Sequence, residues 1–381
     1  MNLRNLTTNF WLGMATLCGL HAAPVYFQTN LSSDISGLAA NTDPNLKNPW
    51  GMSFGPTTPF WVSDQGVDKT TLYNGAGVAQ ALVVSMPAGP GPTGQVFNSS
   101  SSFLLPTGGK ALFLFATLDG TITGWNAGQG TTAFAAVPSN GAVYTGLAIG
   151  TNGTADMLYA ADFAHARIDA FNGTFGLTSL AGNFTDPNLP AGYSPYNVQT
   201  IGGKLYVEYD TVNPTTGRPT TTANTGIVDI FNTDGTFFQR LVTNNHLNSP
   251  WGVTLAPAGF GGFGGDLLVG NFGDGTISAF NPVSGTFVGT VSDQNGNPLV
   301  NSGLWALNFR ASGSGFDPNT LFFTAGINNE ADGLFGEIQA VPEPSSVALI
   351  VLGLGGLTLL RRKRALPVSL NPRRTLIDQL N

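Results

Sequence analysis

Short apolar runs alternate with turn residues along most of the chain, and the pattern is clearest in residues 265–281. This stretch holds an apolar run (Leu267–Val269), a turn rich in Asn, Asp and Gly (271–275) and an alternating run (276–280). Apolar runs bounded by such residues are typical of a strand, a turn and a second strand. Asp274-Gly275 supplies the positive-φ position that a tight turn requires. We therefore predict a β-hairpin here.

The same pattern occurs six times. The strand before the turn recurs at 60–64, 112–116, 157–162, 204–208, 267–271 and 321–324. A third element precedes each hairpin, and its second residue lies at position 50, 93, 145, 196, 251 or 305, so the period is 43 to 55 residues. Several short strands per unit of this length are typical of a β-propeller, in which each unit buries its faces against its neighbours.

These repeats predict an all-β fold, a single six-bladed β-propeller over residues 24–340, with a β-sandwich of accidental similarity as the alternative. Residues 24–37 contain Val25-Tyr26-Phe27 and are expected to add an outer strand to the last blade, which would close the ring. The Thr- and Pro-rich segment 211–224 is interpreted as a loop within the fourth blade.

The two ends of the chain differ from the repeats. Residues 1–23 combine Arg4, an apolar segment at 10–20 and small residues at Ala22-Ala23, which predicts a signal peptide; the alternative is a buried N-terminal helix. Near the other end, Pro342-Glu343-Pro344 precedes an apolar run that we interpret as a single transmembrane helix at 345–360. A basic cluster follows, and it would hold that end on the cytoplasmic side; it consists of Arg361, Arg362, Lys363 and Arg364.

Residues 341–364 together resemble the PEP-CTERM sorting signal of Gram-negative bacteria. The resemblance implies processing by an exosortase-type enzyme at the inner membrane, where the protein would be anchored transiently before its release to the cell surface or the extracellular space. The chain departs from the usual pattern because 17 residues follow Arg364, and we expect this segment, 365–381, to be a disordered tail.

A second resemblance concerns the repeats. The strand 158–162, followed by Arg167-Ile168 and Phe171, resembles an NHL-type repeat. Further segments, such as 43–46, 48–51, 185–193 and 330–336, are similar to those of a family of exported bacterial propeller proteins of unknown activity that often carry PEP-CTERM tails. This resemblance implies the fold and export, and it brings no catalytic residues with it.

Charge and cysteine content exclude several classes of function. Residues 24–340 contain 17 Asp and 3 Glu against 4 Lys and 4 Arg, a net charge of −12. An acidic body argues against binding to nucleic acid, which requires a basic surface. The one cysteine, Cys18, lies in the predicted signal peptide, so the mature protein would have neither a disulfide nor a thiolate site.

Two groups of residues are candidates for a binding site. Four aromatic residues begin predicted innermost strands at one level of the channel, where they either bind a sugar or a peptide or plug the channel by packing; they are Trp50, Tyr196, Trp251 and Trp305. Three side chains occupy equivalent positions at strand ends, where they either order turns or hold a calcium ion; they are Asp64, Asp162 and Asn271. No other cofactor is expected.

Catalytic residues are scarce. His165 and His246 are the two histidines of the mature chain, so a site with several histidine ligands for zinc is excluded. Of the three glutamates in the body, Glu208 lies within a predicted core strand and is the best single acid candidate; its alternative role is in a polar network between blades.

The sequence therefore favours an exported binding or scaffold protein without catalytic activity, associated with exopolysaccharide or another surface ligand. Two alternatives stay open. One is a calcium-dependent hydrolase or lactonase-like propeller, against which the scarcity of glutamate argues. The other is a carbohydrate-binding, lectin-like propeller that uses the aromatic residues.

Overall fold

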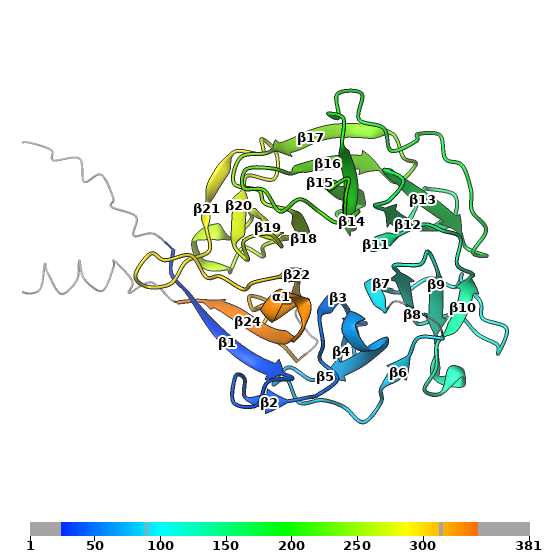
Figure 1. Cartoon of the computed structure of the whole chain (residues 1–381), viewed down its shortest axis with the longest axis horizontal. Helices are drawn as coiled ribbons and strands as arrows, with labels where there is room; N and C mark the ends of the chain where they lie inside the picture. Colours follow the sequence, from blue (N-terminus) through cyan, green and yellow to red (C-terminus); the bar gives the residue numbers. More distant parts are fainter. Residues whose placement is uncertain (1–23, 88, 90, 312–314, 342–381) are drawn as a thin grey trace, which may run out of the picture.

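Six small sheets, antiparallel except for the parallel pair β1 (Tyr26–Ser33) and β2 (Asn41–Thr42), surround one central axis in the computed structural model of the chain (Figure 1). The structure describes residues 24–341 except 88, 90 and 312–314. The predicted six-bladed β-propeller is confirmed, and each blade starts with an innermost strand at one of the six predicted third elements. The predicted signal peptide, the motif Pro342-Glu343-Pro344, the transmembrane run 345–360, the basic cluster 361–364 and the tail 365–381 lie outside the described residues.

The strands follow one another outward from the axis in each of the first five blades. Blade 1 comprises β3 (Pro49–Ser53), β4 (Phe60–Asp64), β5 (Lys69–Tyr73) and β6 (Val84–Ser85). Blade 2 comprises β7 (Pro92–Phe97), β8 (Phe113–Thr117), β9 (Ile122–Trp125) and β10 (Phe134–Val137). Blade 3 comprises β11 (Tyr144–Thr151), β12 (Asp156–Asp162) and β13 (Arg167–Asn172). Blade 4 comprises β14 (Tyr193–Ile201), β15 (Lys204–Thr211), β16 (Ile227–Asn232) and β17 (Phe237–Thr243). Blade 5 comprises β18 (Pro250–Leu255), β19 (Leu267–Asn271), β20 (Ile277–Phe280) and β21 (Phe287–Thr290).

Blade 6 is built from both ends of the described chain. It comprises β22 (Leu304–Phe309), β23 (Leu321–Ala325) and β24 (Leu334–Ala340), to which β1 (Tyr26–Ser33) and β2 (Asn41–Thr42) add two outer strands. The β1 strand runs antiparallel to β24, with Tyr26 opposite Ala340. The Tyr26 hydroxyl also donates to the Phe260 carbonyl at 3.2 Å, which ties this strand to blade 5. The expected closure of the ring by the N-terminal segment is thus confirmed.

The remaining elements are single turns between the strands. They are η1 (Gln65–Val67), η2 (Ala127–Gln129), η3 (Gly261–Phe263) and α1 (Ile327–Glu330). The predicted hairpin at 265–281 is formed by β19 and β20, and Gly275 has the expected positive φ of 75°. Asp274 Oδ1 accepts a hydrogen bond from the Thr276 amide at 3.0 Å, so this side chain shapes the turn.

The third residue of most innermost strands is a glycine because neighbouring blades come closest there. A Cβ on Gly51 would lie 2.5 Å from the Thr93 carbonyl oxygen, and a Cβ on Gly252 would lie 2.3 Å from that of Trp305. Gly94 and Gly146 occupy the same place in blades 2 and 3 and are equally crowded. The recurring glycine is therefore a requirement of packing between blades.

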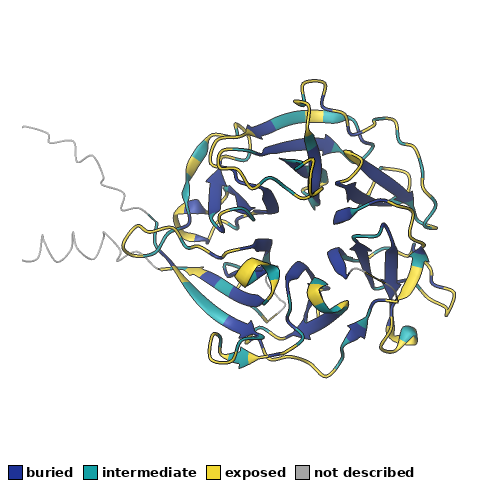
Figure 2. Ribbon diagram, in the orientation of Figure 1, coloured by how far each residue is buried: buried dark blue, intermediate teal, exposed yellow. Residues whose placement is uncertain are grey.

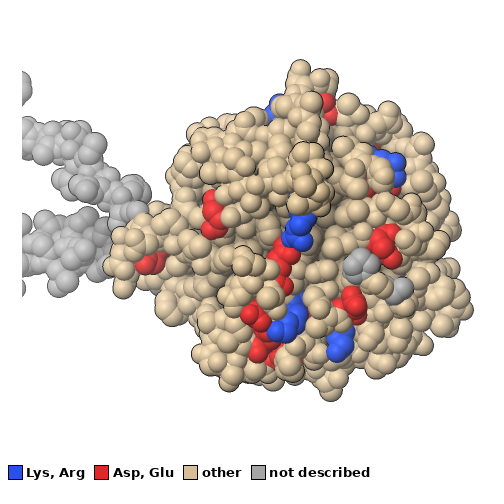
Figure 3. All heavy atoms as spheres, in the orientation of Figure 1, with Lys and Arg blue, Asp and Glu red and all other residues tan. Residues whose placement is uncertain are grey.

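The core lies between the blades and around the axis, and it consists mainly of β-branched and aromatic side chains. Buried residues concentrate on the inner and middle strands, whereas exposed ones lie at loops and outer edges (Figure 2). The face seen in Figure 3 is hollowed near the axis, and charged side chains gather around this hollow. Among the residues that the structure describes, no helix has the length and apolar character needed to cross a membrane.

Candidate functional site

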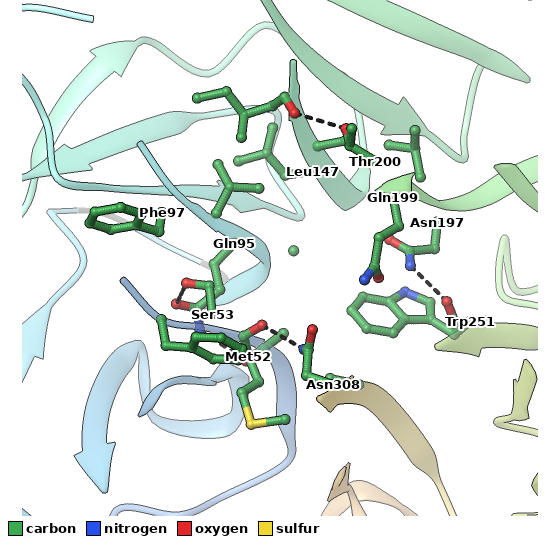
Figure 4. A pocket seen from close by; sticks show the side chains of 18 residues that line it. Met52, Ser53, Gln95, Phe97, Leu147, Asn197, Gln199, Thr200, Trp251 and Asn308 are labelled. Carbon is green, nitrogen blue, oxygen red and sulfur yellow. Dashed lines mark hydrogen bonds between the residues drawn. The ribbon is translucent and has the colours of Figure 1, made fainter. Parts of the chain in front are cut away.

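A polar channel runs between the innermost strands. It has a volume of about 250 Å³, and its 18 lining residues include no charged side chain. All six innermost strands contribute to its wall. The polar groups are amides and hydroxyls, and Figure 4 shows them directed into one space: Ser53, Gln95, Asn197, Gln199, Thr200 and Asn308.

Irregular strand pairing places these side chains. The register between the innermost strand and its neighbour shifts near the start in every blade, for example between Pro250 and Gly252 in β18. A bulge bends its strand and redirects the side chains that follow. The residue within the shift, such as Trp251, packs at the axis, whereas later residues of the strand face the channel.

Several channel side chains connect neighbouring blades. Gln95 Nε2 donates to the Gly51 carbonyl at 2.9 Å, and Asn308 Nδ2 donates to the Met52 carbonyl at 3.0 Å. Asn197 Nδ2 donates to the Trp251 carbonyl at 2.6 Å. Gln199 differs, since its side chain makes no hydrogen bond to any residue that the structure describes. Its amide is thus the one most available to a ligand, and each connecting amide keeps a lone pair or an N–H free.

The four predicted aromatic residues do meet at the axis, where they form a plug. Trp50 and Trp305 stack with ring centroids 3.7 Å apart, and Trp251 stands edge-on to both. Tyr196 lies 6.0 Å from Trp305. All four are at most 5 % exposed, so their faces are covered by one another. Ligand binding at this ring stays a prediction, and it requires a contact other than an open indole face.

The plug divides the axis into two compartments. Trp251 lines the channel, whereas Phe272 lines a cleft of about 500 Å³ on the opposite side. Trp305 contacts both rings, with centroid distances of 5.5 Å to Trp251 and 4.3 Å to Phe272. The Trp50 indole N–H is buried and has no partner among the described residues.

The three residues of the predicted column, Asp64, Asp162 and Asn271, end the second strands of blades 1, 3 and 5. Each side chain bonds within its own blade. Asp64 accepts from Thr71 Oγ1 at 2.7 Å, Asp162 from the Val143 amide at 3.0 Å, and Asn271 from the Asn248 amide at 3.0 Å.

The three side chains of this column belong to separate blades. Within the described ranges, no three His, Cys, Asp or Glu side chains are grouped so that they could hold a metal ion. Burial raises the pKa of the Asp64 carboxyl well above its usual range, and the hydrogen bond from Thr71 opposes that shift. The hydrogen bonds of the column are those of side chains that order strand ends, and calcium binding at this column stays a prediction.

Glu208 is fully buried in β15, and neither carboxyl oxygen has a hydrogen-bond partner among the described residues. Burial raises its pKa well above the usual range. The sequence did not single out Asp229, another buried carboxyl, whose pKa rises to about 8 through burial and the nearby charge of Asp186. Neither Glu208 nor Asp229 lines the channel, although Glu208 lies directly opposite the channel residue Asn197 in the pairing of β14 with β15.

The sequence interpretation missed the cleft beyond the plug. Its lining includes Arg218 from the loop between β15 and β16 and Glu330 from α1. One signal was available, since Arg218 is one of only four arginines in residues 24–340. Because the two residues are 112 positions apart, their pairing follows only from the circular arrangement of the blades.

Comparison with known proteins gives a family. The chain is 34 % identical over 326 residues to the uncharacterized protein R648 of Acanthamoeba polyphaga mimivirus, which covers 81 % of this chain and 78 % of that one. It is 32 % identical over 325 residues to the uncharacterized protein L690 of the same virus, covering 81 % and 84 %. The chain belongs to the family of these two proteins. No activity is attached to the family by either name.

The C-terminal region matches the PEP-CTERM protein-sorting motif over residues 340–364, nearly the range predicted. This motif implies export, with sorting at the membrane by an exosortase.

Solved structures confirm the fold alone. A Bacteroides thetaiotaomicron protein of unknown function has a TM-score of 0.52 at 12 % identity, covering 84 % of this chain and 77 % of its own. An auxiliary nutrient binding protein from Bacteroides ovatus has a TM-score of 0.51 at 11 % identity, covering 84 % and 78 %.

Proposed function

We propose that the protein is an exported binding protein that holds an uncharged, polyhydroxylated ligand in the polar channel, and that it acts at the cell surface or in the extracellular matrix. The observation that carries the proposal is the chemistry of the channel wall, where six amide or hydroxyl side chains converge and no charged residue occurs. Amides donate and accept hydrogen bonds side by side, as do the hydroxyls of a sugar.

The size of the channel suits a single saccharide unit. Its volume of about 250 Å³ lies just below the range of roughly 300–1,000 Å³ that is usual for ligand pockets. Trp251 closes one part of the wall, but its ring is buried in the plug, so the amide and hydroxyl groups supply the recognition. A saccharide unit at the end of an exopolysaccharide chain satisfies these requirements.

The sorting motif is in accord with this role, because it implies delivery beyond the inner membrane, where exopolysaccharide is exposed. The acidic body, with a net charge of −12 over residues 24–340, favours a neutral ligand over a polyanion. Binding in the channel requires no metal ion and no catalytic group.

The test is a glycan array followed by titration calorimetry with the neutral saccharide that gives the strongest signal. Gln199→Leu is expected to weaken binding at least tenfold, because the ligand loses the hydrogen bonds of this amide. The fold should be unaffected, because the amide has no partner among the described residues. Gln80→Leu, at an exposed glutamine in blade 1, is the matched control and should bind as the parent does. The proposal fails if no neutral saccharide binds in the millimolar range, or if Gln199→Leu binds unchanged.

A further inference from the structure

A single ion pair spans the cleft on the other side of the plug. Arg218 Nη2 lies 2.5 Å and 2.6 Å from the two carboxylate oxygens of Glu330. The Arg218 side chain is 58 % exposed and that of Glu330 is 17 % exposed. The cleft around them holds about 500 Å³, so the pair stands at the edge of unfilled space.

The position of Glu330 is fixed by an unusual turn. Three successive residues of α1, Asn328, Asn329 and Glu330, have φ of 53°, 55° and 68°, the left-handed region that residues other than glycine adopt at a cost. Asn328 Nδ2 donates to Asp332 Oδ2 at 2.8 Å, and Asp332 pairs with Lys47 at 2.9 Å. These contacts hold the turn, and with it the Glu330 carboxylate.

Arg218 is held much less firmly. It lies in the loop between β15 and β16, and more than half of its long side chain faces solvent. An exposed ion pair contributes little net stability, so its partners exchange readily. The guanidinium can therefore swing away from Glu330 into the cleft while the carboxylate stays in place.

The charges of this pair specify a class of ligand. A simple anion would take Arg218 and leave the partly covered Glu330 carboxylate without a partner, and a simple cation would do the reverse. A zwitterion inserted between the two side chains pairs with both. Phe272 supplies an aromatic surface in the lining of the same cleft, next to the Thr221 and Ser302 hydroxyls.

We propose that this cleft binds a free α-amino acid with an apolar side chain, with its carboxylate on Arg218, its ammonium group on Glu330 and its side chain against Phe272. This site is separate from the polar channel, since the aromatic plug lies between them. Its existence does not depend on the function proposed for the channel.

The first test uses the parent protein and three probes. Titration calorimetry with L-phenylalanine is expected to show one site per chain. N-acetyl-L-phenylalanine, which lacks the ammonium group, and L-phenylalaninamide, which lacks the carboxylate, should each bind at least tenfold more weakly. The absence of binding by L-phenylalanine in the millimolar range, or equal binding by either analogue, overturns the proposal.

The second test uses variants. Arg218→Gln and Glu330→Gln should each weaken binding of L-phenylalanine at least tenfold, with circular dichroism showing that the fold is retained. Arg167→Gln is the matched control, because Arg167 is 52 % exposed and pairs with Asp169 away from the cleft. Gln199→Leu should also leave this affinity unchanged. Unaltered binding by both cleft variants would refute the site even if the channel bound a saccharide.

Discussion

The indole N–H of Trp251 donates a hydrogen bond of 3.1 Å to the carbonyl oxygen of Thr145. The two residues belong to the innermost strands of blades 5 and 3, which are not sequential neighbours. This bond therefore joins two blades that are separated by blade 4. It combines a polar contact with the packing of a large ring in the aromatic plug.

Replacing Trp251 by phenylalanine should destabilise the protein by about 2–3 kcal/mol, because the variant loses this hydrogen bond and leaves a cavity at the axis. Urea unfolding measures the change. Trp125→Phe is the control, since Trp125 is also buried and donates to the Gly130 carbonyl at 2.8 Å but lies in the third strand of blade 2. An equal loss of unfolding free energy in Trp125→Phe would show that the hydrogen bond between blades 3 and 5 does not stabilise the protein more than a bond within one blade.

Gly252→Ala should cost about 3 kcal/mol, because the added methyl group would meet the backbone of blade 6 at 2.3 Å and overpack the interface. Gly150→Ala provides the comparison on another innermost strand, where the nearest atom to a new Cβ is 3.6 Å away. Thermal unfolding of both variants is the measurement. Similar melting temperatures for the two would contradict the close-approach explanation of the recurring glycine.

Glu208→Gln should change the pH dependence of stability. Because burial raises the pKa of Glu208 in the folded protein, folding takes up a proton at pH values between the ordinary carboxyl pKa and the raised one. The stability of the parent is therefore full below the ordinary pKa and falls as pH rises towards the raised value, by at most about 1.4 kcal/mol per pH unit.

Glutamine does not titrate, so Glu208→Gln should not lose stability in this way as pH rises. The difference in unfolding free energy between the variant and the parent should therefore increase from pH 4.5 to pH 8. Denaturant unfolding across that range measures the difference. Asp317→Asn alters an exposed carboxylate and should show no such trend. A parallel pH profile for Glu208→Gln and the parent would mean that Glu208 is ionised in the folded state.

Tyr26→Phe should destabilise the protein by about 1 kcal/mol, because the hydroxyl donates to the Phe260 carbonyl and accepts from the Phe263 amide, both at 3.2 Å. Phe27→Ser, at a neighbouring side chain that is 64 % exposed, should have a smaller effect. Thermal unfolding followed by circular dichroism compares them. A larger loss at Phe27 would show that the contacts of β1 with blade 5 do not secure the closing strand.

Much of the fold follows from local patterns in the sequence. The β4 and β19 strands have the predicted bounds. Each is an apolar run that ends in Asp64 or Asn271, and such a pattern indicates both the strand and the turn that follows it. The closing strand was predictable too, since Val25-Tyr26-Phe27 has a strand pattern and no partner nearby in sequence.

The candidate sites were less accessible to prediction. The aromatic residues were found by their register, but only packing in three dimensions shows that Trp50 stacks on Trp305 and is covered by it. Gln199 and Asn308 carry no sequence signal, because a bulge and the curvature of the ring turn their side chains to the channel. The pairing of Arg218 with Glu330 depends on contacts between distant loops and on three left-handed residues that no local pattern predicts.

The pairing of β1 with β24 also imposes an order of events on the growing chain. The strand that completes the ring is made first, yet its partner is made more than 300 residues later, as the register of Tyr26 with Ala340 shows. The edge of β1 that pairs with β24 therefore has no hydrogen-bond partner during synthesis. The same holds during any passage across a membrane that starts at the N-terminus. The ring thus cannot close until the residues just before the sorting motif have emerged. The fold is therefore complete only when the whole domain has been made and translocated.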